Sequence, residues 1–539
     1  MTRLIRSRAG LCAVLLAGLG AAPATGPAVT RIRSVIPAGG ELLEMQLGDV
    51  DGDGLRDLFL AVRLEDGSRR LHIHRLRADG SYPPRPDHDL EVKVDIVCWG
   101  IGEFRPEDPG DELLLLTRQG AYTLSPRRES YGGNIEKLIG ANLLLDLPTD
   151  RALPVWEAIA DVDGDGRDDV ALATSEGFLL VDTAPLRGPD GKPQLDSRGR
   201  PQFVEFGRVP LRPTGGRAPA YERSFLLFSP TFSSQPLADL FVPDEDPGAI
   251  DPPPALFAED SLPVPVLVDG DGDGLLDLLY HQGGLLYWHR QLPAGAPGGP
   301  RFQPQPDRVA SMGDGDMELR RLEPAVVGGG PAADLLVTRS VSGASVGGGD
   351  WQFVLFHDYF ARARAAAPDA QFTVDTLTGK AYFRDFDGDG RLDVGISAWG
   401  LSISAIGTAI AGGSVDIKHT VTLYMGGRDG FSRRADVRYE RNYSADDFTA
   451  FSDVPPFPGD MNGDGTVDLL ESDPKGVLEI RPLRMVGGAP KFDAKPGTTI
   501  VVDALQSRVD AFDLNADGVA DLLIAPLLSS TLELYVSKL

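Results

Sequence analysis

The sequence predicts an all-β protein built from repeated four-stranded units, and three observations carry this prediction. The 539 residues include 64 Gly and 43 Pro, a density typical of many short strands joined by turns and not of a helical bundle. One acidic nine-residue pattern recurs six times along the chain. Each copy is followed by a short apolar run of the kind expected for a buried strand.

Residues 1–24 are predicted to be a signal peptide that lies outside the folded domain. Its start is rich in arginine, residues 9–22 are uncharged and mostly apolar, and residues 22–24 read Ala-Pro-Ala, which suits a cleavage site. A short membrane anchor is the alternative, although the run is too short to span a bilayer comfortably. We therefore expect an exported chain, secreted or periplasmic, with residues 25–539 forming one domain and no transmembrane segment after cleavage.

Charge and cysteine content restrict the classes of function. The chain has 79 acidic and 52 basic residues, which gives a formal net charge of -27. A surface this acidic repels nucleic-acid phosphates, so no nucleic-acid partner is expected. Cleavage would remove Cys12 and leave Cys98, so no intrachain disulfide can form. Cys98 lies in an apolar, strand-like run, which predicts a buried structural thiol.

The repeated pattern places oxygen atoms at a spacing that suits calcium. Positions 1, 3, 5 and 9 are always Asp or Asn, and position 6 is always Gly. Calcium takes six to eight oxygen ligands. Alternate short carboxylates on a curled loop can converge on one point, and glycine permits the sharp turn. The position 7 carbonyl would complete the set.

Acidic surface turns are the alternative reading, because Asp-Gly is a common turn pair. Six copies with identical spacing leave that alternative little weight, and we expect about six Ca²⁺ sites. The predicted ligands, with position 7 contributing its carbonyl, are Asp49, Asp51, Asp53, Leu55 and Asp57; Asp161, Asp163, Asp165, Arg167 and Asp169; Asp269, Asp271, Asp273, Leu275 and Asp277; Asp385, Asp387, Asp389, Arg391 and Asp393; Asp460, Asn462, Asp464, Thr466 and Asp468; and Asp513, Asn515, Asp517, Val519 and Asp521.

The loops differ from EF-hands, which need an acidic residue at position 12 and a helix on each side. Position 12 is not acidic in five of the six copies. The copy at Asp460 offers Glu471, but a proline-rich segment precedes it instead of a helix. Each loop is therefore expected at a turn between two strands.

The ninth-position Asp serves as a ruler for a longer repeat. It falls at 57, 169, 277, 393, 468 and 521, and degenerate units near 112 and 334 bring most spacings to 53–59 residues. About four strands fit into each unit, which is the count in a blade of a β-propeller. We predict eight blades, with the ring closed when the strand Val29–Val35 completes the last blade. Residues 204–262 hold a run at 237–242 that leaves a ninth blade open, and seven blades also remain open.

With these loops and spacings, the chain resembles the FG-GAP and VCBS repeat proteins, which include the propeller of integrin α subunits. The resemblance covers nearly all of residues 25–539, although the Phe-Gly and Gly-Ala-Pro signatures are poorly kept. It implies a calcium-binding propeller in which positions 1, 3, 5 and 9 and the position 7 carbonyl hold the ion. It also implies a role in recognition or cell adhesion.

Residues that could support catalysis are scattered. The sequence has no nucleophile elbow, phosphate-binding loop or dinucleotide fingerprint. His72 and His74 would share a strand face, and a solvated face is favoured over a metal pair. Arg187–Arg217 and Arg428–Tyr443 are the best candidates for an enzyme site.

Two classes of function therefore remain. The favoured reading is a monomeric, non-catalytic propeller that binds an extracytoplasmic protein or glycan. The alternative is a polysaccharide lyase or hydrolase built on the same calcium-binding fold.

Overall fold

The computed structural model describes the chain from residue 29 to the C-terminus, with internal gaps. The described residues are 29–210 and 265–539, apart from Glu129, 146–148, Ser175, Arg198, 283–284, 294–300, 312–316, 328–329, 342–348, 363–366, 402–415, 428–429, 445–453, 474–475, 503–506 and 527–529. The predicted signal peptide lies outside the described residues. So does the run at 237–242.

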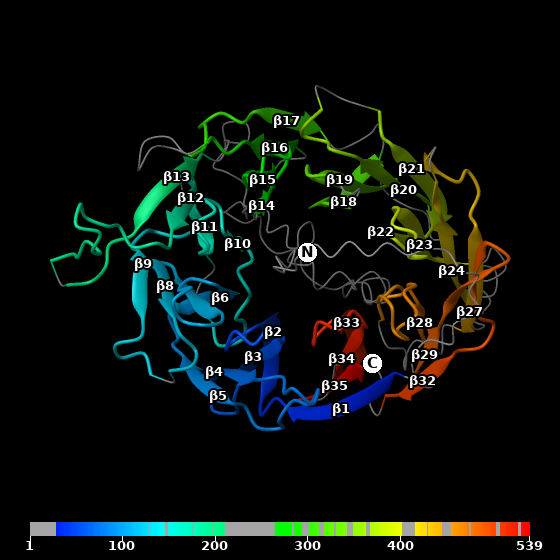
Figure 1. Cartoon of the computed structure of the whole chain (residues 1–539), viewed down its shortest axis with the longest axis horizontal. Helices are drawn as coiled ribbons and strands as arrows, with labels where there is room; N and C mark the ends of the chain where they lie inside the picture. Colours follow the sequence, from blue (N-terminus) through cyan, green and yellow to red (C-terminus); the bar gives the residue numbers. More distant parts are fainter. Residues whose placement is uncertain are drawn as a thin grey trace, which may run out of the picture.

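Eight antiparallel sheets follow one another around a central axis, and together they form an eight-bladed β-propeller (Figure 1). In blades 1 to 7 the strands run outward from the axis in chain order, so β2 is innermost in the first blade and β5 is outermost. Within the described part of the chain, no helix has the length and apolarity needed to cross a membrane. The prediction of an all-β propeller with eight blades is confirmed.

The first four blades each contain four strands. They are β2 (Glu41–Gly48), β3 (Asp57–Arg63), β4 (Arg69–His74) and β5 (His88–Val92) in blade 1; β6 (Ile96–Gly102), β7 (Glu112–Thr117), β8 (Gly120–Leu124) and β9 (Glu136–Ile139) in blade 2; β10 (Ile159–Ala160), β11 (Asp169–Thr174), β12 (Gly177–Asp182) and β13 (Val204–Val209) in blade 3; and β14 (Val266–Val268), β15 (Asp277–Gln282), β16 (Leu285–His289) and β17 (Arg308–Ser311) in blade 4.

The second four blades complete the ring. They are β18 (Met317–Ala325), β19 (Asp334–Val341), β20 (Gly349–Phe356) and β21 (Ala370–Thr376) in blade 5; β22 (Thr378–Arg384), β23 (Asp393–Leu401), β24 (Asp416–Tyr424) and β27 (Val437–Ser444) in blade 6; β28 (Leu469–Ser472), β29 (Val477–Arg481) and β32 (Thr498–Val501) in blade 7; and β33 (Ser507–Phe512), β34 (Asp521–Pro526), β35 (Thr531–Lys538) and β1 (Thr30–Pro37) in blade 8.

The second strand of a blade is buried on both faces, because each blade packs against two neighbours. In β3 the five residues from Leu58 to Val62 are fully buried. Phe59 and Ala61 face blade 2, where Phe59 lies 6.4 Å from Trp99, ring centre to ring centre. Leu58 and Leu60 face blade 8. This two-sided burial explains why the sequence shows continuous apolar runs after each loop instead of alternation.

Both ends of the chain build the last blade. β1 pairs antiparallel with β35 over eight residues, from Thr30 against Lys538 to Pro37 against Thr531. Ile36 of β1 is fully buried in the core between blades 8 and 1. The predicted closure by the N-terminal strand is therefore confirmed. Residues 204–209 form the outer strand of blade 3 instead of a further blade.

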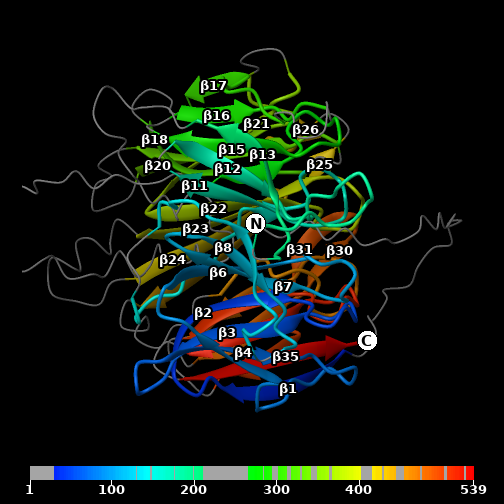
Figure 2. The same ribbon diagram turned by 90° about the vertical axis from the view of Figure 1, so that its left-hand side faces the viewer.

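Two small hairpins were not anticipated from the sequence. They are β25 (Gly426–Gly427) with β26 (Gly430–Phe431) in blade 6, and β30 (Leu483–Val486) with β31 (Ala489–Phe492) in blade 7. Both lie on the same side of the ring (Figure 2). Gly426 donates to Asp393 and Thr466 donates to the carbonyl of Leu483, so this is also the side that carries the acidic loops.

Candidate metal centres

Five of the six acidic loops join the first and second strands of a blade, the blade 7 loop leads directly into β28, and all six share one backbone course. In five loops positions 4 and 6 are glycines with positive φ, such as Gly52 at 76° and Gly54 at 84°. In blade 8 position 4 is Ala516, which keeps a φ of 58°. The glycine at position 6 was understood from the sequence, whereas the same need at position 4 was missed.

Loop amides point at the carboxylates of positions 1 and 5. In blade 1, Asp49 accepts from the amides of Gly52 at 2.7 Å and Gly54 at 2.8 Å, and Asp53 accepts from Leu55 at 2.9 Å. Equivalent bonds recur in the other five loops. These bonds fix the orientation of the carboxylates at positions 1 and 5 through contacts within the loop itself.

The carboxylates converge in four loops. One oxygen from each of three residues lies within 4.8 Å of the other two in the groups Asp49, Asp51 and Asp53; Asp161, Asp163 and Asp169; Asp269, Asp271 and Asp273; and Asp385, Asp387 and Asp393. In blade 7 the amide nitrogen of Asn462 donates to Asp468, and in blade 8 that of Asn515 donates to Asp517 and to the carbonyl of Ser537.

The ninth-position Asp has a second task that the spacing did not reveal. It is 0–1% exposed in all six loops, and one of its oxygens accepts the amide of position 2, as in Val50 to Asp57 at 2.9 Å. Burial raises the pKa of Asp57, Asp277, Asp468 and Asp521 to about 7, and that of Asp393 to about 6. A bound divalent ion would remove the cost of ionising these buried acids.

The two degenerate blades keep the ninth-position acid but lose the alternating Asp/Asn pattern, and the blade 5 loop has no other carboxylate. In blade 2, Glu112 is fully buried and receives the guanidinium of Arg127 at 3.1 Å. In blade 5, Asp334 is 2% exposed and contacts Nδ1 of His357 at 3.1 Å, a bond that raises the pKa of His357. In both blades that lack the repeated pattern, a basic side chain faces the buried acid.

These observations test whether calcium suits the loops. The side-chain donors at positions 1, 3, 5 and 9 are all carboxylate or amide oxygens, the ligands that hard cations prefer. The buried acid needs a positive partner, and two blades supply one from the chain itself. The residues therefore fit a calcium ion. The carbonyls of Leu55, Arg167, Leu275, Arg391, Thr466 and Val519 remain predicted ligands.

The loops of neighbouring blades are joined by backbone hydrogen bonds. The amide of position 8 donates to a carbonyl at the start of the preceding loop, for example Ala520 to Asp460 at 2.6 Å and Arg56 to Leu514 at 2.9 Å. Such a bond spans six of the eight blade boundaries: Asp111 to Asp49, Asp168 to Glu103, Ala333 to Asp269, Val467 to Phe386, Ala520 to Asp460, and Arg56 to Leu514. An ion in one loop would therefore stabilise a contact with the next blade.

The expectation of a solvated face for His72 and His74 was wrong. His72 is 9% exposed and His74 is fully buried, because both pack inside blade 1. Their Nδ1 atoms contact the carbonyls of Ala38 at 3.0 Å and Pro83 at 2.9 Å. Cys98 is buried, as predicted.

A buried polar network between blades 6 and 7 was also missed. Glu471 accepts from Tyr439 at 2.7 Å and Arg481 at 2.9 Å, and Arg441 lies 3.3 Å away. Ser397 Oγ is 2.8 Å from Nε2 of His419, whose Nδ1 is 3.8 Å from Glu471.

Ser397, His419 and Glu471 are the residue types of a hydrolase triad, but they lack its geometry. The distance from His419 to Glu471 exceeds a hydrogen bond, Glu471 is already committed to Arg481 and Tyr439, and Ser397 is only 7% exposed. The network therefore joins two blades. Its members come from five strands, so no sequence motif could have indicated it.

Replacing Glu471 with Gln should destabilise the protein by about 3–5 kcal/mol, because the change leaves Arg441 and Arg481 short of a buried counter-charge. Burial alone would raise the pKa of Glu471, but the nearby His419, the bond from Tyr439 and the charge of Arg441 lower it to about 2. The stabilisation is present above the ordinary pKa of Glu and is lost as pH falls toward 2. Urea unfolding at several pH values measures both effects.

The control for this prediction is Glu440→Gln on β27, whose carboxylate is exposed and pairs with Lys418 and Arg438. It should change the free energy of unfolding by less than about 1 kcal/mol. Equal losses for Glu471→Gln and Glu440→Gln would contradict the network's role.

The two candidate enzyme segments do not assemble a site from their described residues. Within 187–210, Arg200 pairs with Asp196 at 3.0 Å and Arg208 pairs with Glu205 at 2.9 Å. Within 430–443, the side chains of Tyr439 and Arg441 turn inward to Glu471. The local pairing of these cations leaves no converging acid and base among them.

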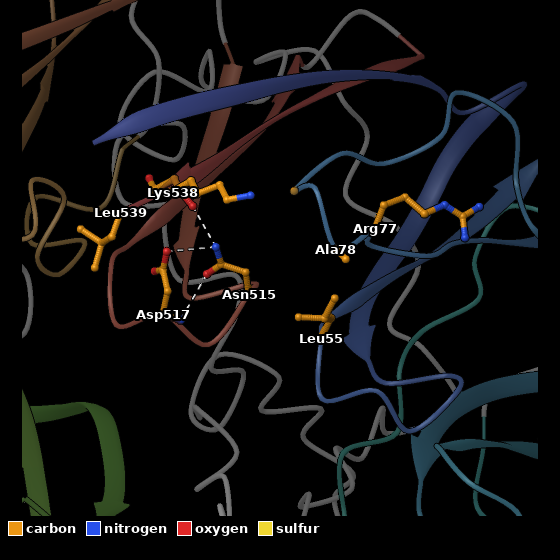
Figure 3. Close-up of a pocket in the computed structure, with 9 residues that line it drawn as sticks. Leu55, Arg77, Ala78, Asn515, Asp517, Lys538 and Leu539 are labelled. Atoms are coloured by element: carbon orange, nitrogen blue, oxygen red, sulfur yellow. Dashed lines mark hydrogen bonds between the residues drawn. The ribbon is translucent and has the colours of Figure 1, made fainter. Parts of the chain in front are cut away.

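One surface pocket lies at the seam between blades 8 and 1 (Figure 3). Its volume is about 290 Å³, and Asn515 and Asp517 of the blade 8 loop form one wall. Leu55 and Ala78 face them from blade 1. Arg77 of the lining already pairs with Asp87 at 2.5 Å. The pocket thus adjoins a candidate metal loop and does not form a separate reactive centre.

Fold and loops together define the class: an eight-bladed propeller with six acidic, glycine-turned loops on one side. No protein-family model matches the chain, and no curated protein matches its sequence. Solved structures share the propeller at low similarity. The β-propeller domain of Cps50 (Swd1) from Myceliophteria thermophila is 11% identical with a TM-score of 0.29, covering 94% of this chain and 98% of that one.

Two further structures are similar to the same extent. Sqt1 from Chaetomium thermophilum, bound to the N-terminus of ribosomal protein L10, is 9% identical with a TM-score of 0.41, and the match covers 94% and 99% of the two chains. A putative 6-phosphogluconolactonase from Bacteroides uniformis is 9% identical with a TM-score of 0.28, covering 87% and 85%. Function must be argued from the loops, because likeness at this level carries no argument about it.

Proposed function

We propose that the protein is an exported, calcium-binding β-propeller that acts as a non-catalytic recognition module for a protein or glycan outside the cytoplasm. Calcium would occupy the six acidic loops and stabilise the blades. The observation that carries the calcium proposal is the contrast between blades. Six loops carry the Asp/Asn pattern beside a buried acid, and three carboxylates converge in four of them, while Glu112 and Asp334 in the other two blades face Arg127 and His357 instead.

The resemblance to FG-GAP and VCBS proteins and the predicted signal peptide support the extracytoplasmic setting. Cleavage of the signal peptide removes three arginines and takes the net charge from -27 to -30, and six calcium ions would bring the charge of the mature chain to -18. It would still be acidic, which favours neutral or cationic partners over nucleic acid or polyanions. The absence of converging catalytic groups in the two arginine-rich segments, among their described residues, supports recognition over catalysis.

Isothermal titration of calcium into chelator-treated protein tests the metal proposal. We expect about six ions per chain, and Asp161→Asn should remove one. Asp95→Asn is the matched control, because Asp95 is an exposed turn residue outside the loops. Binding of fewer than two ions by the native protein would contradict the proposal.

The partner is tested by incubating calcium-loaded protein with extracts of its native envelope and with a panel of neutral and acidic polysaccharides. Capture of a partner that chelator releases would support a recognition module. Appearance of unsaturated sugar products would instead establish the lyase alternative.

A further inference from the structure

The four loops with Asp at all four side-chain positions differ in one nearby residue. In each blade, the third strand pairs with the residue that follows the ninth-position Asp, as in Leu58 with His74 and Leu278 with His289. The next residue along the third strand lies beside the loop. It is Arg75 in blade 1, Asp182 in blade 3, Arg290 in blade 4 and Met425 in blade 6.

The two arginines reach into their loops. Arg290 contacts Asp271 at 2.6 Å and Asp273 at 2.8 Å, at positions 3 and 5 of the blade 4 loop. Arg75 makes the corresponding ion pair with Asp51 in blade 1. Both are two-thirds buried or less, so part of each guanidinium remains in solvent.

The backbone holds both arginines at this place. The amide of Arg75 donates to Asp87 at 2.9 Å, and the amide of Arg290 donates to Asp307 at 2.8 Å. The following amides, of Leu76 and Gln291, donate to the ninth-position acids of the same loops. The amides of Met425 and Gly426 in blade 6 make the corresponding bonds to Asp436 and Asp393, so the blades share this backbone arrangement and differ in the side chain that it presents to the loop.

The set of converging carboxylate oxygens differs between the loops that have such an arginine and the loops that do not. In blades 3 and 6 the three converging oxygens come from positions 1, 3 and 9, so the buried acid joins the group. In blades 1 and 4 they come from positions 1, 3 and 5. Two other arginines approach loop carboxylates without repeating this pattern. In blade 3, Arg301 lies 3.5 Å from Asp163, and the carboxylate of Asp182 offsets the charge of Arg301. In blade 6, the half-exposed Arg391 lies 3.4 Å from Asp389.

We infer that Arg75 and Arg290 are affinity-setting residues, which occupy the loops of blades 1 and 4 as built-in counter-ions and make these loops bind calcium more weakly than the loops of blades 3 and 6. The inference rests on the proposed calcium binding. An entering ion must displace the guanidinium and is repelled by its charge. Removing a positive charge a few ångströms from a divalent ion is worth roughly tenfold in affinity even in the dielectric of water.

The test compares Arg75→Gln/Arg290→Gln with the native protein by calcium titration of chelator-treated samples. We expect two sites to become about tenfold tighter while the total number of ions stays the same. Arg70→Gln is the control. Arg70 lies on β4, which ends at His74 next to Arg75, and it pairs with the exposed Asp89, so the substitution removes one positive charge nearby without touching a loop carboxylate. In a background of Asp49→Asn and Asp269→Asn, the gain should disappear.

Thermal melting gives a second readout that needs no binding model. In chelator the double variant should melt below the native protein, because its empty loops lose their counter-charge. In saturating calcium the rise in melting temperature should be larger than for the native protein. If the native protein binds calcium and the double variant binds it with the same affinity, the inference alone is overturned. Native protein that binds no calcium would overturn the proposed function as well.

Discussion

Adding excess chelator to the purified protein is expected to lower its melting temperature by on the order of 10 °C or more. An ion present at about 100 times its dissociation constant stabilises the folded state by roughly 2.7 kcal/mol, and each of the six loops would contribute in this way. The loops also carry the backbone bonds between blades, such as Ala520 to Asp460, so their loss weakens the packing of the ring. Differential scanning calorimetry with and without chelator measures the change.

Restoring calcium should restore the melting temperature, and magnesium should not, because it is smaller and demands a stricter octahedral shell. Asp161→Asn should reduce the chelator effect by about one sixth, whereas Asp95→Asn should leave it unchanged. A melting curve that is the same in calcium and in chelator would contradict the stabilising role of the ion.

Removing residues 25–38 is expected to abolish cooperative folding of the ring. This segment carries β1, whose eight backbone pairs with β35 complete blade 8. Without it, β35 becomes an open edge that can pair with other chains, so the truncated protein should aggregate. Size-exclusion chromatography and calorimetry of the truncated and full-length chains measure the loss.

A pair of point variants keeps this prediction testable when the truncated chain does not fold. Ile36→Ala removes a fully buried side chain from β1 and should cost about 2–5 kcal/mol. Val35→Ala on the same strand removes a side chain that is 41% exposed and should cost less than about 1 kcal/mol. Similar costs at the two positions would show that β1 is not packed as described.

The blade count could be predicted because the ninth-position acid marks every unit. It persists as Glu112 and Asp334 where the rest of the pattern is lost, since it still ties its loop to the adjoining strand through buried amide bonds. The apolar runs that follow it are buried on both faces and are therefore easy to recognise. Closure by the first strand followed from an unmatched strand at each end of the repeat series.

Other features could not be predicted, because they depend on residues from different strands. His74 is fully buried, with its Nδ1 2.9 Å from the carbonyl of Pro83, and strand alternation alone does not describe such a contact. The network at Glu471 joins β23, β24, β27 and β29 with β28. The contact of Arg290 with Asp271 depends on the exact register between β15 and β16. Such pairings are set by the assembled ring and leave no spacing signal.

The pairing of β1 with β35 joins segments about 500 residues apart, and this has a consequence for how the chain folds. Blades 1 to 7 use consecutive strands and can form in the order of synthesis. The eighth must wait for the last residues, so its first strand is made earliest and placed last. Contacts of such long sequence separation form slowly. We therefore expect a late kinetic phase in folding, in which β1 pairs with β35 and closes an otherwise complete ring.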